Sequence, residues 1–169
     1  MCRHLKLALS LWLALPLGAA ALESDRQQPI QVQADSVELD NRTGVSTYRG
    51  NVVLEQGTLH LEADLLKVYR GNDELDRIEA EGRPVRLRQR PEGAAADVEG
   101  EALRLEYRAA ADRLLLEGSA SVRQGGDLFS GERIEYDIVH SRVQASGQDN
   151  GSGRVHAIIQ PRSDGEPKP

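Results

Sequence analysis

Apolar and polar residues alternate along most of this chain with a period of two. The apolar positions fall in the groups Val37/Leu39, Val52/Leu54, Leu59/Leu61, Leu66/Val68, Val85/Leu87, Leu103/Leu105 and Val155/Ala157/Ile159. Their polar neighbours include Glu38, Lys67, Arg86, Arg88 and Arg104. This alternation turns one side chain inward and the next outward, which is typical of a half-buried β-strand. The pattern therefore predicts an all-β fold of short strands, as a sandwich, a jelly roll or a solenoid-like stack.

Two interleaved elements repeat along the chain. A small residue followed by an acid opens an alternating run at Asp35, Asp64, Glu101 and Glu132. A glycine opens a second run at Gly50, Gly82 and Gly118. Copies of each element are spaced by roughly 30 residues, as in a stacked architecture. The recurring acids could be paired catalytic carboxylates, but side chains that cap turn backbone amides at the starts of equivalent strands are the better interpretation.

Residues 92–117 are rich in the good helix formers Ala, Leu, Glu and Arg. We nevertheless predict strands here, because this stretch carries the third copy of the repeat in register. A short helix across residues 107–113 is the alternative interpretation.

The first 21 residues have the pattern of a secretory signal peptide. Arg3 and Lys6 form a basic region, and residues 7–15 are apolar apart from one serine. Ala19 and Ala21 then form an A-x-A-like cleavage signal. The apolar stretch is shorter than the roughly 20 residues that a membrane-spanning helix needs. We therefore predict an exported protein that is cleaved near Ala21.

Composition narrows the classes of function. The formal net charge is −6 and the pI is about 5.3, whereas binding to nucleic acid needs clustered positive charge. The only Met, Cys and Trp all lie within the first 12 residues, so the cleaved chain would have no thiol or disulfide chemistry. We predict one domain over residues 22–161 and a disordered, polar tail at 162–169.

No catalytic or cofactor motif accompanies the strand pattern. His60, His140 and His156 lack the spacing of a metal site. The chain has no G-x-S-x-G elbow, phosphate-binding loop or dinucleotide fingerprint. We predict a protein that is not an enzyme and uses no metal or cofactor. A periplasmic hydrolase that acts through Asp or Glu is a competing hypothesis.

Residues 28–35 (QPIQVQAD) and 48–64 (YRGNVVLEQGTLHLEAD) resemble the repeat of the OstA-like family of lipopolysaccharide export proteins. The resemblance covers about residues 27–161, although residues 82–84 and 118–119 depart from the Gly-Asn of the first copy. It implies an elongated, twisted, incompletely closed β-jelly roll built from repeated antiparallel strands. It also implies a periplasmic protein that holds the acyl chains of lipid A, the lipid portion of lipopolysaccharide.

The resemblance further implies partners. Members of the family stack N-terminal edge to C-terminal edge, both with their own copies and with an LptC-like inner-membrane partner and the N-terminal domain of an LptD-like outer-membrane translocon. A cleavable signal and a short polar tail favour the bridging, LptA-like type of member. An LptC-like member keeps a membrane helix, and an LptD-like member is much longer.

Alternation and resemblance together give two sets of candidate residues. The candidate lipid-facing positions are Ile30, Val32, Val37, Leu39, Val52, Leu54, Leu59, Leu61, Leu66, Val68, Leu87, Leu103, Leu105, Tyr107, Leu116, Phe129 and Ile134. The candidate edge-strand residues for partners are Ile30, Gln31, Val32, Gln33, Val155, His156, Ala157, Ile158 and Ile159. The alternative to an open groove is a closed, ordinary core in a purely structural periplasmic interaction module.

Overall fold

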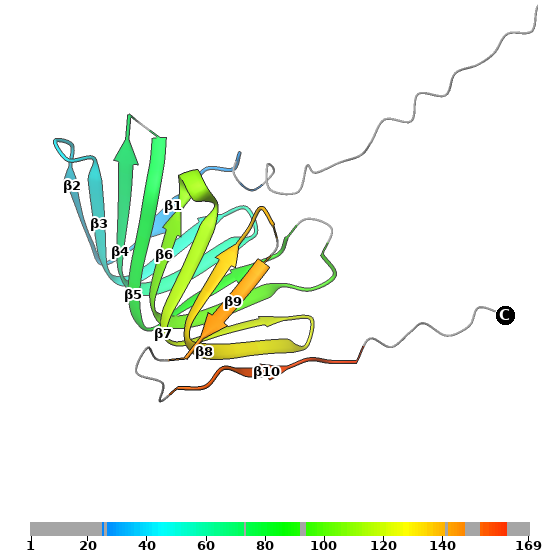
Figure 1. Cartoon of the computed structure of the whole chain (residues 1–169). Helices are drawn as coiled ribbons and strands as arrows, with labels where there is room; N and C mark the ends of the chain where they lie inside the picture. The colour runs from blue at the N-terminus through cyan, green and yellow to red at the C-terminus, as the bar shows by residue number, and fades with distance from the viewer. Residues whose placement is uncertain are drawn as a thin grey trace, which may run out of the picture.

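The computed structural model describes residue 25 and residues 27–72, 74–91, 94–140, 142–147 and 153–161. Nearly all of this part of the chain is antiparallel β-structure (Figure 1). The strands are β1 (Gln31–Gln33), β2 (Ser36–Asp40), β3 (Val45–Gln56), β4 (Leu59–Gly71), β5 (Glu74–Gln89), β6 (Val98–Arg108), β7 (Arg113–Gln124), β8 (Asp127–Asp137), β9 (Arg142–Ser146) and β10 (His156–Ile158). The all-β prediction is confirmed.

The strands form one ten-stranded sheet in which β3 to β8 follow one another in chain order. Each of these strands pairs antiparallel with the next, as expected for a chain of hairpins. At one end, β1 and β2 both pair with β3. At the other end, β9 and β10 both pair with β8. Two short strands therefore line each end of the sheet.

A line of bulges runs across the six long strands. The register shifts between residues 49 and 52, 62 and 65, 81 and 85, 101 and 104, and 117 and 120 in successive strand pairs. A bulge bends its strand, so bulges at one level fold the whole sheet into a V (Figure 1). We call the two halves the β1 leaf, which carries β1 and β10, and the β2 leaf, which carries β2 and β9. The sheet does not close into a barrel, so the predicted incompletely closed jelly roll is confirmed.

The sequence repeat marks these bends, and the prediction of short separate strands was wrong. The six central strands are 11 to 16 residues long and pass through the bend without a break. At the bend, Gly50 and Gly118 have φ angles of 79° and 81°, and Asn51 and Ser119 follow them with φ near 50°. Glycine reaches positive φ without steric cost, which explains the glycine at these two positions.

The repeated acids also belong to the bend. Asp35 lies between β1 and β2, where its backbone N–H donates to the carbonyl of Gly50 (2.9 Å) and its carboxylate accepts from the Asn51 side chain (2.9 Å). The carboxylate of Asp64 lies 3.5 Å from the Arg83 guanidinium. The predicted position at strand starts was wrong for Asp64, Glu101 and Glu132, which lie inside β4, β6 and β8.

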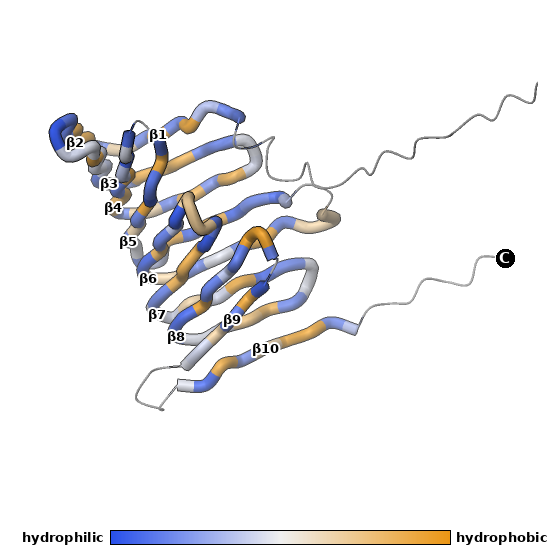
Figure 2. Tube along the Cα trace, turned by 45° about the horizontal axis from the view of Figure 1, so that its top comes forward, coloured by the Kyte–Doolittle hydropathy of each residue, from blue (hydrophilic) through white to orange (hydrophobic). Residues whose placement is uncertain are grey.

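The core lies between the two leaves. Figure 2 shows hydrophobic residues recurring along the successive strands. The largest fully buried side chains are Leu54, Leu66, Leu105, Leu116, Ile134, Val52 and Val85. Burial of an aliphatic side chain of this size contributes about 1.5–3 kcal/mol to folding.

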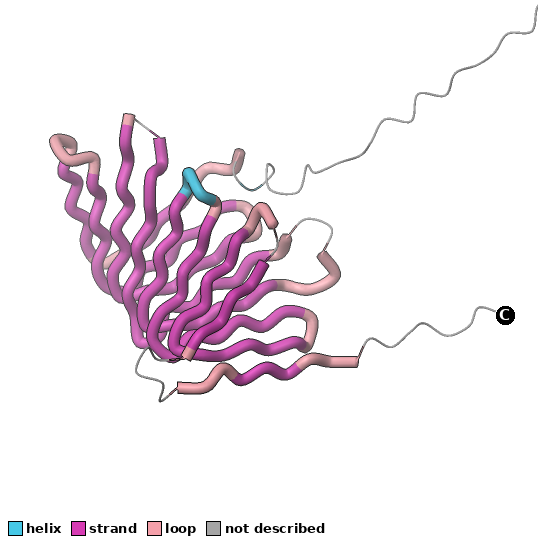
Figure 3. Tube along the Cα trace, viewed as in Figure 1, coloured by secondary structure: helices cyan, strands magenta, loops and turns pink. Residues whose placement is uncertain are grey.

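Within residues 92–117, which are rich in helix formers, the structure confirms the predicted strands. It contains β6 and the start of β7, joined by a 3₁₀ turn at Ala109–Ala111 (Figure 3). The predicted end strands are also present, since residues 31–33 form β1 and residues 156–158 form β10. The predicted signal peptide (residues 1–21) and tail (162–169) lie outside the described residues. No helix within the described ranges is long and apolar enough to cross a membrane.

The bend gives a test of the repeat. A Cβ on Gly50 would collide with the carboxylate of Asp35, and its φ of 79° disfavours any side chain. We expect Gly50→Ala to lower the free energy of unfolding by about 1–2 kcal/mol, measured by urea denaturation. Gly71→Ala is the matched control, because no atom lies within 4 Å of its added Cβ. Equal stability of the two variants would show that the bend does not depend on glycine.

Candidate functional site

The strand register aligns the inward side chains of each leaf in rows that run across the sheet. Residues directly opposite in an antiparallel pair point to the same face. In the β1 leaf one row is Val32, Leu54, Leu61, Leu87, Gly100, Val122, Phe129 and Ala157. In the β2 leaf one row is Tyr48, Leu66, Ala80, Leu105, Leu116, Ile134 and Ala145. An apolar stripe therefore continues across the whole sheet on each leaf.

An apolar cavity of about 110 Å³ lies between the leaves. Leu54, Leu61 and Leu87 line it from the β1 leaf, and Ile78 and Leu105 are among its lining from the β2 leaf. A wider depression of about 410 Å³ lies among charged groups such as Glu62, Arg86 and Glu99. The inner cavity is the candidate site for an aliphatic ligand, because apolar walls stabilise such a ligand and charged walls do not.

Polar groups occur where the strands of the β1 leaf end. Gln56 and Gln89 are the last residues of β3 and β5, and both line the cavity together with Asp25. Tyr107 also lines it, and its hydroxyl donates to Asp112 (3.0 Å). Among the described residues, no group of His, Cys, Asp and Glu side chains is arranged to hold a metal ion.

Most of the predicted inward positions lie on the inner face. The buried ones are Val52, Leu54, Leu61, Leu66, Leu105, Leu116 and Ile134. The half-buried ones are Val32, Leu59, Val68, Leu87, Tyr107 and Phe129. Ile30, Val37 and Leu39 are exposed, with Val37 opposite Tyr48 and Leu39 opposite Ser46 at the end of the sheet. These end residues have only one neighbouring strand to cover them.

Leu103 is the exception, because it lies on the outer face. The side chain is 50% exposed and borders a depression that contains Glu81, Arg104 and Glu117. The bulge between Glu101 and Arg104 interrupts the alternation, so Leu103 and Leu105 are not equivalent. The prediction that Leu103 faces the interior was therefore wrong.

The sequence analysis missed four apolar residues that line the cavity: Leu75, Ile78, Leu114 and Ile138. Ile78 is 7% exposed, and Leu114 pairs with Tyr107 across β6 and β7. Leu114 is the first of three consecutive leucines, and a continuous apolar run does not show which member points inward. Ile78 and Ala80 do alternate with polar residues, so this signal was present.

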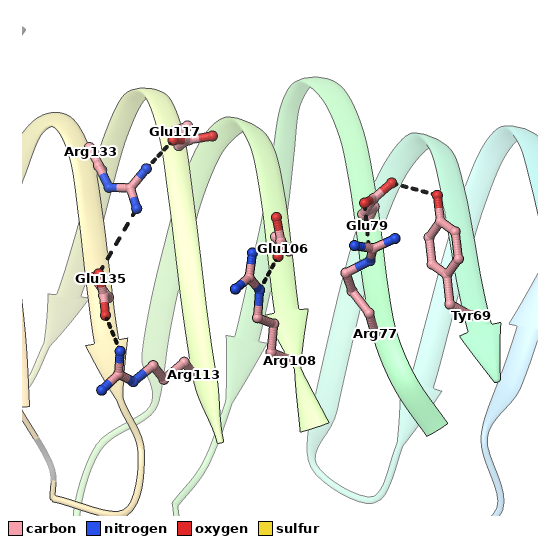
Figure 4. Close-up of polar contacts among 9 residues, drawn as sticks. All are labelled: Tyr69, Arg77, Glu79, Glu106, Arg108, Arg113, Glu117, Arg133 and Glu135. Carbon is pink, nitrogen blue, oxygen red and sulfur yellow. Dashed lines mark hydrogen bonds and ion pairs between the residues drawn. The ribbon is translucent and has the colours of Figure 1, made fainter. Parts of the chain in front are cut away.

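The outer face of the β2 leaf carries a ladder of ion pairs (Figure 4). Arg133 contacts Glu117 and Glu135, and Arg113 contacts Glu135 at 3.2 Å. Each exposed pair contributes at most about 1 kcal/mol, so the ladder does not hold the fold together. It keeps the outer face polar and gives the two faces opposite character.

A mixed polar and aromatic cluster extends this ladder. The Tyr69 hydroxyl donates to Glu79 (2.8 Å), and the Arg77 guanidinium lies 4.2 Å from the centre of the Tyr69 ring (Figure 4). Burial and the hydrogen bond to Glu79 raise the pKa of Tyr69, so the phenol stays protonated and acts as a donor.

Both ends of the sheet present open edges. Among the described residues, β1 and β2 pair only with β3, and β9 and β10 pair only with β8. At the C-terminal edge, Val155 and Ile158 are each 42% exposed and Ile159 is 70% exposed. The analysis of the sequence identified β1 and β10 as edge strands but missed β2 and β9, which complete the same edges on the other leaf.

A folded-over antiparallel sheet with an apolar interior and an open edge at each end defines a class of elongated β-jelly rolls. The family described as "LptA/(LptD N-terminal domain) LPS transport protein" matches residues 31–142. The chain belongs to this family, which confirms the resemblance seen in the sequence.

Named relatives agree with this assignment. The lipopolysaccharide export system protein LptH of Pseudomonas aeruginosa is 36% identical over 151 residues, which cover 85% of this chain and 86% of LptH. The lipopolysaccharide export system protein LptA of Escherichia coli K12 is 34% identical over 163 residues, which cover 92% of this chain and 86% of LptA.

A solved structure shows the same fold. The crystal structure of LptH, described as the LptA-homologous periplasmic component of the lipopolysaccharide transport device of Pseudomonas aeruginosa, superposes with a TM-score of 0.75 and 35% identity. The match covers 82% of this chain and 99% of that chain.

The inner and outer leucines of β6 give a matched test of the two faces. Leu105 is 1% exposed and Leu103 is 50% exposed. We expect Leu105→Ala to lower the free energy of unfolding by about 2–5 kcal/mol, because it leaves a cavity in the core. Leu103→Ala should cost less than about 1 kcal/mol. Urea denaturation measures both, and a reversed order would contradict the assignment of faces.

Proposed function

We propose that this protein is a periplasmic lipopolysaccharide transport protein that shields the acyl chains of lipid A between its two leaves. The observation that carries the proposal is the apolar cavity lined by both leaves, continuous with an apolar stripe along the sheet. Each methylene group moved from water into such surroundings contributes about 0.8 kcal/mol. An amphiphile can therefore keep its acyl chains inside while its polar head group stays in water.

The composition of the interior supports this mode of binding. The interior is built mainly from Leu, Ile, Val and Ala with few aromatic residues, and aliphatic walls suit aliphatic chains. A closed core would serve a purely structural module, which is the alternative function. A crosslinker placed on an inward side chain distinguishes the two functions, because it would label lipid only if lipid enters the space between the leaves.

We also propose that the edges join copies of this protein to one another and to membrane components. An unpaired strand edge binds another strand through backbone hydrogen bonds. Two different edges on one molecule allow a head-to-tail contact between copies. Such contacts form open filaments when the rotation from one copy to the next does not close a ring. The partners would be an LptC-like inner-membrane protein, the N-terminal domain of an LptD-like outer-membrane translocon and other copies of this chain.

Export to the periplasm follows from the predicted signal peptide at residues 1–21, with cleavage near Ala21. The relative LptH is described as a periplasmic component, which supports the same location here. No catalytic step is part of the proposed function. Asp64, one of the repeated acids, forms an ion pair with Arg83 at the bend, which agrees with a structural role for this acid.

Photocrosslinking tests the groove. Leu87 lines the cavity, whereas its neighbour Arg88 is exposed and Leu103 is an apolar residue of the outer face. We expect a crosslinker at position 87 to label lipopolysaccharide and crosslinkers at 88 and 103 to give little label. Position 103 controls for simple adhesion of lipid to an exposed apolar side chain. Equal labelling at all three positions would contradict the proposed lipid path.

Truncation tests the edges. Removal of residues 154–169 deletes β10, which pairs with β8 through Ala157 and Phe129. We expect this variant to lose concentration-dependent oligomers, measured by analytical ultracentrifugation over a concentration series. Lipid binding by the monomer should largely survive, because the rows from β3 to β8 remain. Long oligomers of the truncated chain would show that β10 is not the assembly edge.

A further inference from the structure

The residues that precede β1 are fastened to the hairpin between β3 and β4. The carboxylate of Asp25 accepts hydrogen bonds from the Thr58 hydroxyl (2.6 Å), the Thr58 backbone N–H (3.1 Å) and the Gln89 amide (3.3 Å). Further along, the Gln56 side chain donates to the carbonyl oxygen of Gln28 (3.1 Å). We call Asp25 and residues 27–30 the N-terminal strap.

The hairpin is shaped to receive the strap. Gly57 has a φ of 58°, and a Cβ there would collide with the Asp25 carboxylate. The Thr58 hydroxyl oxygen in turn accepts from the backbone N–H of Arg90 (3.2 Å), just after β5. The carboxylate of Asp25 therefore joins the ends of β3, β4 and β5 at one point.

The strap lies at the apolar cavity. Asp25 and Ile30 both line it, beside Leu54 and Leu59 of the β1 leaf. Ile30 remains 43% exposed, so the strap covers the cavity without being part of the packed core. An aliphatic chain that enters past these residues must displace the strap or pass beside an ionised carboxylate, which disfavours apolar neighbours.

We propose that Asp25 is a latch that holds the N-terminal strap across the mouth of the apolar cavity, and that an aliphatic chain enters when Thr58 and Gln89 release it. Asp25 acts as a positioning residue that controls access and does not itself hold the chain. This inference rests on the proposed function, since it concerns entry into the same cavity.

The latch is suited to reversible opening. Burial acts to raise the pKa of Asp25, but the hydrogen bonds from Thr58 and Gln89 outweigh it and lower the pKa below its ordinary value. Asp25 is therefore ionised at neutral pH, and its hydrogen bonds are charge-assisted. Asp25 is only partly buried, so water can replace Thr58 and Gln89 as hydrogen-bond partners of the carboxylate when the strap moves away.

Two near-isosteric variants weaken the latch. Asp25→Asn removes the charge, and Thr58→Val removes the hydroxyl that donates to Asp25 and accepts from the Arg90 N–H. The probe is an amphiphile with a fluorescent dodecyl chain, and stopped-flow fluorescence measures its rate of association with the full mature protein. We expect each variant to raise this rate at least about threefold, because a larger fraction of molecules is open. The double variant should gain little more than either single one, since both weaken the same hydrogen bond between Thr58 and residue 25.

Asp40→Asn is the matched control. Asp40 also accepts hydrogen bonds from a turn, at Arg42 and Thr43, but it does not line the cavity. Its variant should bind the probe at the wild-type rate. A general effect of losing a turn carboxylate would appear in this control as well.

Hydrogen exchange gives a readout that needs no ligand. The Thr58 amide donates to Asp25, so it should exchange faster in Asp25→Asn than in the wild type. Unchanged exchange would overturn the latch. If the wild type binds the probe, and Asp25→Asn and Thr58→Val bind it no faster, the latch is also overturned. If neither the wild type nor the variants bind the probe, and a crosslinker at position 87 does not label lipopolysaccharide, both the latch and the proposed function are overturned.

Discussion

In the part of the chain that the structure describes, no other layer covers the apolar face of the single antiparallel sheet, so the sheet buries that face against itself. Most sheets solve this problem with helices or with a second sheet. Here each long strand bends at the same level, and the two leaves become each other's covering layer. Gly50 and Gly118 make the bend sterically possible. Leu54 and Leu105, which lie on opposite leaves, become buried when the sheet bends, and this burial stabilises the bent form.

Several features of the sequence predicted this arrangement, and the bends explain the errors. Alternation identified the inner face wherever a strand runs straight, as at Leu54 and Leu87. It failed at Leu103, because a bulge changes which residue points inward and leaves no mark in the alternation itself. The glycines and acids of the repeat were interpreted as strand boundaries, since in a sequence a bend and a turn use the same residues. The edge strands β2 and β9 were missed because their pairing with β3 and β8 is not encoded within either strand alone.

Open edges are a hazard that natural β-proteins usually block with charge, proline or a covering loop. This chain keeps Val155, Ile158 and Ile159 exposed at its C-terminal edge and leaves β1 and β2 without an outer partner among the described residues. Its ion-pair ladder lies on the outer face, where it keeps that face polar, and not on the edge strands at the ends of the sheet. In the proposed function, association would therefore occur at the ends, as a head-to-tail bridge requires.

The same side chains serve as core and as proposed binding surface, and this sets a limit on how well they can pack. A core packed to full density would leave no room for an acyl chain, and a wide empty groove would expose leucines to water and lower the stability of the fold. A cavity of about 110 Å³ between otherwise buried rows is a compromise between these limits. In the proposed function an acyl chain would replace contacts between the leaves with contacts of similar character. Binding would then depend on the small difference between two apolar packings, which favours passage from one protein to the next over permanent retention. In the proposal for Asp25, its hydrogen bonds to Thr58 and Gln89 would regulate entry into this cavity without holding the acyl chain themselves.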